Sequence, residues 1–148
     1  MAETYMVIGG SASGKSTFAE QLACRLQSDF SYPVYYLATG SIEDDEFARR
    51  VKRHQERRPQ DWQTIEEKHQ LAGAIRKCGL NNAIILVDGI GTWISNLLLL
   101  YGGFDCQPDD ELNRKVMQNL EEVAAAMGNA RGMVIMVADE VGMGVVPA

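Results

Sequence analysis

Residues 9–16 read GGSASGKS, which fits the phosphate-loop pattern G-x-x-x-x-G-K-[ST]. The apolar run 5–8 precedes this stretch, and the segment 14–27, with apolar residues at helical spacing, follows it. The pattern requires this order of strand, loop and helix. Its glycines let the backbone turn tightly, so that several N–H groups point at one phosphate beside the positive end of a helix. The stretch therefore predicts nucleotide binding, and the alternative is a chance glycine turn.

Two side chains at the end of this loop have chemical roles in the pattern. Lys15 reaches the β- and γ-phosphates of a nucleotide, so we predict that it is catalytic, and the hydroxyl of Ser16 binds Mg²⁺. An acid that supports the Mg²⁺ should follow an apolar strand. Asp88, after 84–87, is the better placed candidate, and Asp139 with Glu140 is the rival. The alternative for each of these acids is a solvated carboxylate at a strand end.

The rest of the chain alternates between apolar runs of strand length and segments of helical periodicity. We expect further strands at 34–38, 83–87 and 133–137. We expect further helices at 41–56, ended by Pro59, and at 71–78, 92–101 and 109–127. Strands that alternate with helices form a parallel sheet covered on both faces. The predicted fold class is therefore α/β, P-loop NTPase-like, with a mostly parallel sheet and helices on both faces.

Length and composition bound the function. A chain of 148 residues favours one domain, and a net charge of −6 argues against a nucleic-acid-binding protein. The three cysteines show no C-x-x-C spacing, so they suggest neither a disulfide framework nor a zinc site. The N-terminus lacks the features of a signal peptide, and the most apolar region, 84–101, is too polar to span a membrane. We expect a cytoplasmic protein, and the absence of an N-K-x-D element disfavours a regulatory GTPase.

A cluster of positive charge stands out in this acidic chain. Six of the fourteen basic residues fall in one short stretch: Arg49, Arg50, Lys52, Arg53, Arg57 and Arg58. Such a cluster indicates an anionic ligand nearby, and the alternative is a solvated helix face. At helical spacing Phe47, Val51 and His54 share one face with Arg58, so the apolar members would carry His54 towards the protein interior.

His54 has two interpretations. A lone inward histidine is more often a hydrogen-bonded structural residue than a catalyst. Here the neighbouring cations disfavour the imidazolium, so the ring stays neutral and nucleophilic. The same arginines would hold the phosphates of a nucleotide and stabilise departing pyrophosphate. His54 is therefore a candidate nucleophile for nucleotidyl transfer, whereas His69 has no such neighbours and is predicted to be structural.

These motifs together resemble one family, the bifunctional adenosylcobinamide kinase / adenosylcobinamide-phosphate guanylyltransferases of cobalamin biosynthesis. The most specific part is the pattern R-x-x-x-H-x-x-x-R-P-x-x-W-x-T-x-E, which begins at Arg50 and ends at Glu66. The resemblance also covers the phosphate loop and the stretches 36–39, 45–51, 88–97 and 140–147.

The resemblance implies two reactions. The family phosphorylates adenosylcobinamide with ATP or GTP, then transfers GMP from GTP to adenosylcobinamide phosphate through a covalent histidine, which corresponds to His54. It also implies a homotrimer. The nucleotide contacts that it implies are Gly9, Gly10, Ser11, Ala12, Ser13, Gly14, Lys15, Ser16, Ala38, Thr39, Gly40, Gln55, Glu56, Arg57, Arg58, Glu66 and Asp88. The metal ligands would be Ser16 and Asp88.

The chain departs from the family pattern at three places. The loop lacks the arginine that commonly precedes its serine, and Asp139 stands where asparagine is usual. The family also continues past Pro147, so we expect residues 1–148 to form a single P-loop kinase-like domain that lacks the final helix and strand. Two alternatives stay open: a small-molecule P-loop kinase without guanylyl transfer, and a truncated non-catalytic nucleotide-binding remnant.

Overall fold

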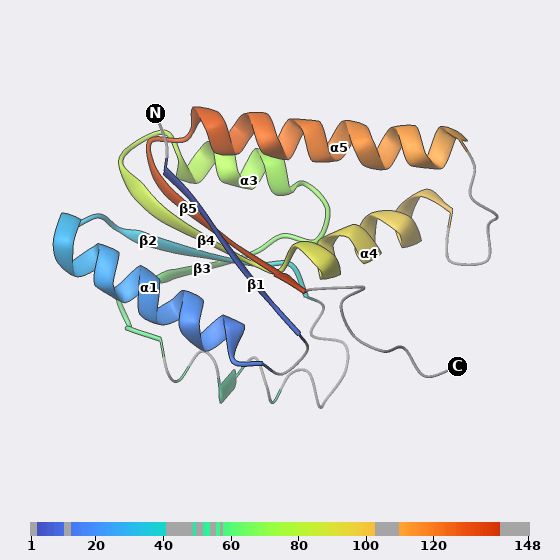
Figure 1. The fold of residues 1–148 in the computed structure, drawn as a ribbon. Coiled ribbons are helices and arrows are strands. Elements are labelled where there is room, and N and C mark those ends of the chain that lie inside the picture. The colour runs from blue at the N-terminus through green and yellow to red at the C-terminus, as the bar shows by residue number, and fades with distance from the viewer. Residues whose placement is uncertain are drawn as a thin grey trace.

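A five-stranded parallel sheet forms the centre of the protein (Figure 1). The computed structural model describes residues 3–10, 13–40, 49, 52–53, 56, 58–102 and 110–139. The strand order is β1-β5-β4-β2-β3. The strands are β1 (Glu3–Gly9), β2 (Val34–Ala38), β3 (Gln63–Glu66), β4 (Ala83–Asp88) and β5 (Gly132–Asp139).

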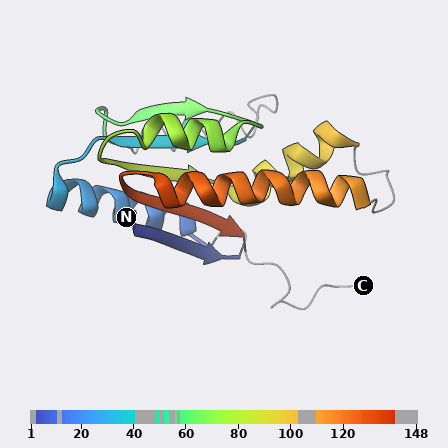
Figure 2. The same cartoon turned by 90° about the horizontal axis from the view of Figure 1, so that it is seen from above.

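Helices cover both faces of this sheet, as Figures 1 and 2 show. The helix α1 (Lys15–Phe30) lies on one face. The other face carries α3 (Leu71–Cys78), α4 (Ile90–Tyr101) and α5 (Asp110–Asn129). The predicted α/β class with a parallel sheet is confirmed.

The core has two halves because the central strands are buried on both faces. On β4, Ile85 and Val87 pack towards α3, α4 and α5, where Trp93 is fully buried. The alternate residues Ile84 and Leu86 pack towards α1. A strand buried on both sides has a continuous apolar sequence, which is why residues 83–87 stand out so clearly in the chain. Burial of this kind is the main favourable contribution to folding.

The elements differ from the prediction in one strand and in several boundaries. The strand at 34–38 and the helix at 71–78 begin and end as expected, and the other predicted elements within the described residues differ by a few residues at one or both ends. The strand β3 was not predicted, because its sequence QTIE is polar and three of its four residues are exposed. It forms an edge of the sheet beside β2, where the backbone ladder and not apolar burial defines the strand.

Some predicted features lie outside the described residues. They include most of the helix at 41–56, the environment of His54 and the segment after Asp139. Cys24 and Cys78 are free thiols. None of the helices that the structure describes is both long and apolar enough to span a bilayer.

Parallel pairing fixes where functional side chains must gather. The strands all end at one edge of the sheet, and in the paired registers Gly9 stands opposite Asp139, and Ala38 opposite both Glu66 and Asp88. Ligands of parallel α/β sheets bind at this carboxyl edge. The phosphate loop follows β1 at this edge, so the candidate active site lies at the carboxyl edge of the sheet.

Candidate active site

The phosphate loop is a tight turn that needs its glycines. The backbone N–H of Ser13 donates to the carbonyl of Gly10 over 3.2 Å. A Cβ atom on Gly9 would lie 2.5 Å from Oγ of Ser13, so a side chain there would displace the turn. Gly14 has a φ of 85°, in the left-handed region that favours glycine. The spacing of glycines in the sequence is therefore a requirement of the turn itself.

The loop leads directly into an anion-binding helix terminus. Gly14 is the N-cap of α1, and it has no side chain to satisfy the first N–H groups of the helix. The first turn of α1 also contains no acidic residue. A helix terminus that lacks both a capping side chain and an acidic residue presents its positive dipole end to an anion such as a phosphate.

Lys15 is held across the mouth of the loop by two contacts. Its Nζ donates to the carbonyl oxygen of Gly10 over 3.1 Å and lies 2.5 Å from Oδ1 of Asp139. The Lys15 side chain is 14% exposed, whereas that of Asp139 is 52% exposed. The ion pair places the ammonium at the end of β5, beside the loop that the sequence predicts to bind phosphate.

Asp88 and Tyr36 form the second polar contact of the edge. The hydroxyl of Tyr36 donates to Oδ2 of Asp88 over 2.6 Å, and the guanidinium of Arg58 lies 3.6 Å from the centroid of the Tyr36 ring. Burial raises the pKa of the Tyr36 hydroxyl well above its ordinary value. The charge of Asp88 and the hydrogen bond to it act in the same direction, whereas Arg58 opposes them. Tyr36 therefore stays a hydrogen-bond donor to Asp88 across the physiological pH range.

A buried threonine fixes the backbone just beyond Asp88. Oγ1 of Thr39 donates to the carbonyl of Gly89 over 2.7 Å and accepts from the N–H of Gly89 over 3.0 Å. Asn96, on α4, donates to the carbonyls of Thr39 and Lys68. These contacts tie the ends of β2 and β4 to each other and to α4, so the backbone next to Asp88 is held by several elements.

Arg58 lies beside a small pocket on the β3 side of the edge. The pocket has a volume of about 230 Å³ and is lined by Arg58, Pro59, Gln60, Trp62 and Thr64. Arg58 itself is buried and donates to Oγ1 of Thr64 over 3.3 Å. The indole of Trp62 donates to Gln27 on α1, which anchors this loop to the helix that follows the phosphate loop.

The structure brings most of the predicted site residues to the carboxyl edge. These are Gly9, Gly10, Ser13, Gly14, Lys15, Ser16, Ala38, Thr39, Gly40, Glu66 and Asp88. Ser11, Ala12, His54, Gln55 and Arg57 lie outside the described residues. Of the basic cluster, Arg49, Lys52 and Arg53 are exposed and Arg58 is buried; Glu56 is exposed as well. His69 contributes backbone atoms to hydrogen bonds with Glu67 and Trp93.

Sequence reasoning gave no role to Tyr36 or Asn96. Tyr36 lies two residues before the end of β2, as Leu86 does on β4, so its side chain shares a sheet face with Asp88. That relation becomes visible only when the pairing of β2 with β4 is known. Asn96 makes contacts across 57 and 28 residues of sequence, and no local pattern predicts them.

The side chains present fit a magnesium ion that is held together with a nucleotide. Within the part of the chain that is described, no group of three or more His, Cys, Asp or Glu side chains forms a metal site. Mg²⁺ is usually bound through one or two protein oxygens, with phosphates and waters as the other ligands. A hydroxyl after the phosphate loop and one carboxylate, Ser16 and Asp88, suit that mode of binding.

The glycine turn, the uncapped helix terminus and Lys15 at the carboxyl edge of a parallel sheet define a P-loop nucleotide-binding protein of the α/β class. Comparison with known proteins narrows the class further. Residues 5–148 match the family described as cobinamide kinase / cobinamide phosphate guanyltransferase, and the chain belongs to this family.

Relatives of known name agree with this assignment. The chain is 36% identical over 146 residues to the bifunctional adenosylcobalamin biosynthesis protein CobU of Escherichia coli (strain K12), covering 96% of this chain and 77% of that protein. It is 35% identical over 142 residues to the bifunctional adenosylcobalamin biosynthesis protein CobP of Pseudomonas aeruginosa, covering 96% of this chain and 74% of that protein. Cobinamide kinase and guanyltransferase activity in cobalamin biosynthesis is thus the function of this chain.

Proposed function

We propose that the chain uses the carboxyl edge for both reactions and that His54 carries the guanylyl group between them. In the first reaction the hydroxyl of adenosylcobinamide attacks the γ-phosphorus of ATP or GTP. The bond from that phosphorus to the β-phosphate oxygen breaks, a nucleoside diphosphate leaves, and the hydroxyl proton passes to water. In the second reaction GMP from GTP joins the new phosphate, and pyrophosphate is released.

Phosphoryl transfer is assigned to the phosphate loop. Lys15 would bind the β- and γ-phosphates and stabilise the charge that develops on them, while the N–H groups of the loop hold the triphosphate in place. Ser16 and Asp88 would hold Mg²⁺, which when bound supplies charge neutralisation for the phosphates. The geometry of Lys15, directed across the mouth of the loop towards Asp139, supports this role.

Guanylyl transfer is assigned to His54. A neutral imidazole nitrogen would attack the α-phosphorus of GTP, the bond to the β-phosphate oxygen would break, and pyrophosphate would leave. The phosphate of adenosylcobinamide phosphate would then attack the same phosphorus and release the histidine. The observation that carries this proposal is the buried contact of Arg58 with Tyr36, which is itself bonded to Asp88. Arg58 follows His54 by four residues in the sequence, and Arg58 itself is held at the phosphate-binding edge.

Intact mass spectrometry after incubation with GTP and Mg²⁺ tests the proposal. We expect a gain of one GMP that is labile to acid, is absent in His54→Ala and is retained in His69→Ala. The latter variant is a matched control, because His69 makes its hydrogen bonds through backbone atoms that the substitution keeps. An adduct that persists in His54→Ala would show that another residue is the nucleophile.

The two alternatives give other results in the same experiment. A small-molecule kinase without guanylyl transfer would form no adduct, and its nucleotide hydrolysis and phosphoryl transfer would be unaffected by His54→Ala. A non-catalytic remnant would bind GTP without adduct or turnover. The homotrimer, the cytoplasmic location and the lack of nucleic-acid binding remain predictions, and size-exclusion chromatography with light scattering measures the first of them.

A further inference from the structure

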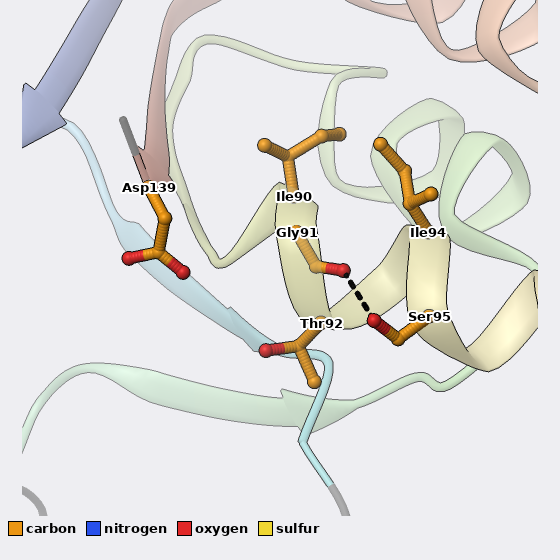
Figure 3. A pocket seen from close by; sticks show the side chains of 6 residues that line it. All are labelled: Ile90, Gly91, Thr92, Ile94, Ser95 and Asp139. Carbon is orange, nitrogen blue, oxygen red and sulfur yellow. Dashed lines mark hydrogen bonds between the residues drawn. The ribbon is translucent and has the colours of Figure 1, made fainter. Parts of the chain in front are cut away.

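A second pocket lies at the carboxyl edge, on the opposite side of Asp88 from Arg58. It has a volume of about 490 Å³ and is lined by Ile90, Gly91, Thr92, Ile94, Ser95 and Asp139. Figure 3 shows Asp139, at the end of β5, facing the first turns of α4 across this space. The volume is within the range of about 300–1,000 Å³ that is usual for small-molecule sites.

The polar end of this pocket adjoins the phosphate loop. Asp139 lines the pocket through its side chain, and Oδ1 of the same carboxylate lies 2.5 Å from Nζ of Lys15. A kinase must bring the hydroxyl of its acceptor to within about 3–3.5 Å of the phosphorus that it receives. An acceptor site must therefore adjoin Lys15 without overlapping the phosphate-binding turn, and this pocket satisfies both conditions.

The lining suits a neutral alcohol with an apolar body. Ile90 and Ile94 form an apolar wall and pack against the core, so they are held in place from behind. Thr92 and Ser95 contribute hydroxyl groups, and the proton of Ser95 is directed to the carbonyl of Gly91 over 3.1 Å. The carboxylate of Asp139 faces the pocket as a hydrogen-bond acceptor, and the oxygen of Ser95, whose proton is used, can only accept a further bond.

The charge of the pocket argues against a nucleotide as its occupant. A phosphate inside the pocket would lie against the Asp139 carboxylate, which loses its pairing when Lys15 binds the nucleotide in the loop, whereas an uncharged hydroxyl there would donate a hydrogen bond to it. The pocket beside Arg58 has the opposite charge and is the better match for an anion. The two pockets thus differ in the sign of the group that each would accept.

We infer that the pocket between β5 and α4 binds the hydroxyl-bearing arm of cobinamide during phosphoryl transfer. Ile90 and Ile94 contact the alkyl part of the arm, and its hydroxyl lies between Thr92 and Asp139, next to Lys15. The inference rests on the proposed function, because it gives that function its acceptor site. After transfer the arm carries a phosphate, which Asp139 repels, so the product leaves this pocket more readily than the substrate does.

Gly91, which lines the pocket, allows a test with a single added methyl group. A Cβ atom on Gly91 would lie 3.5 Å from Oδ2 of Asp139, in ordinary van der Waals contact, so Gly91→Ala narrows the pocket without backbone strain. Gly73→Ala is the matched control, because Gly73 lies within α3, where a Cβ atom would meet open space. Both substitutions replace a glycine within a helix by alanine, which has the higher helix propensity.

We expect Gly91→Ala to raise the dissociation constant of cobinamide, measured by equilibrium dialysis, at least about fivefold, a loss equivalent to one displaced contact. Its dissociation constant for a fluorescent GTP analogue should stay within about twofold of wild type, and Gly73→Ala should change neither value. If the wild-type protein phosphorylates cobinamide but Gly91→Ala binds it with an unchanged dissociation constant, the acceptor site lies elsewhere.

A second variant tests the hydroxyl itself. Thr92 is exposed, so Thr92→Val should fold normally while it loses one hydrogen-bonding group. We expect wild type to bind cobinamide more tightly than an analogue whose arm lacks the hydroxyl. The ratio of the two dissociation constants should be about threefold to tenfold smaller in Thr92→Val. An undiminished preference in Thr92→Val would overturn the placement of the hydroxyl.

A wild-type chain that binds GTP but neither binds nor phosphorylates cobinamide would instead refute the proposed function, and this inference with it.

Discussion

The hydroxyl of Tyr36 donates a 2.6 Å hydrogen bond to Oδ2 of Asp88, while the face of the same ring lies 3.6 Å from the Arg58 guanidinium. One aromatic side chain thus links the strand that carries the candidate magnesium ligand to the loop that follows His54. The hydrogen bond occupies one carboxylate oxygen and fixes the direction of the other. Groups that orient a metal ligand in this way influence the affinity of the site for its metal.

Tyr36→Phe should weaken magnesium-dependent nucleotide binding. The ring and its contact with Arg58 are retained, whereas Asp88 loses the donor that orients it. We expect the gain in GTP affinity that Mg²⁺ provides to fall by about tenfold, with affinity in EDTA unchanged. Titration of a fluorescent GTP analogue with and without Mg²⁺ measures both quantities. Tyr35→Phe is the control, because Tyr35 packs on the opposite face of the sheet, and an equal effect in that variant would contradict the assigned role.

The same tyrosine predicts how stability depends on pH. Burial, followed by the charge of Asp88, raises the pKa of Tyr36 above that of a tyrosine in the unfolded chain. Below a pH of about 10 both states keep the phenol proton, so this contribution to the free energy of unfolding is fully present. Above that pH the unfolded chain releases the proton first, and the free energy of unfolding falls by up to about 1.4 kcal/mol per pH unit.

Urea denaturation between pH 8 and about 11 tests this dependence. Wild type should lose stability on the alkaline side more steeply than Tyr36→Phe, because the variant has no phenol at this position to titrate. Identical alkaline slopes for the two proteins would show that Tyr36 ionises in the folded state as it does in the unfolded chain.

Thr39→Val should destabilise the fold. Thr39 is fully buried, and its hydroxyl both donates to and accepts from the backbone of Gly89. Valine keeps the shape but leaves an N–H and a carbonyl without this partner, at a cost of about 2–3 kcal/mol in the free energy of unfolding. Thr39→Ser keeps the oxygen and should lose less than half as much. Chemical denaturation of the three proteins side by side makes the comparison, and equal losses for both variants would show that the methyl group matters more than the hydroxyl.

The sequence was sufficient for the parts of this protein that local chemistry determines. The phosphate loop has a spacing that its turn requires, and the buried strands β4 and β5 carry no polar side chain before their terminal aspartates. The direction of each strand follows from the alternation with helices, so the carboxyl edge and the candidate residues Lys15 and Asp88 could be named in advance.

What the sequence could not give depends on which strands are neighbours. The edge strand β3 is polar, and the contact of Tyr36 with Asp88 joins residues that are 52 positions apart. The sequence offers Asp139 as a rival magnesium ligand, and its ion pair with Lys15 arises because β5 lies directly beside β1. Each of these relations is a consequence of the strand order, which periodicity along a single chain does not specify.

The ion pair between Lys15 and Asp139 predicts opposite effects from its two partners. Lys15→Met should reduce kcat for phosphoryl transfer by about a hundredfold or more, because it removes a charge that acts on the transferred group.

Asp139→Asn removes the competitor for the ammonium, and since the aspartate is half exposed, GTP should bind only about twofold to fivefold more tightly. Asp29→Asn, at the far end of α1, removes an equal charge away from the loop and should leave GTP affinity unchanged. Calorimetric titration with GTP distinguishes these variants. Weaker binding in Asp139→Asn would mean that Asp139 positions Lys15 for the nucleotide and does not compete with it.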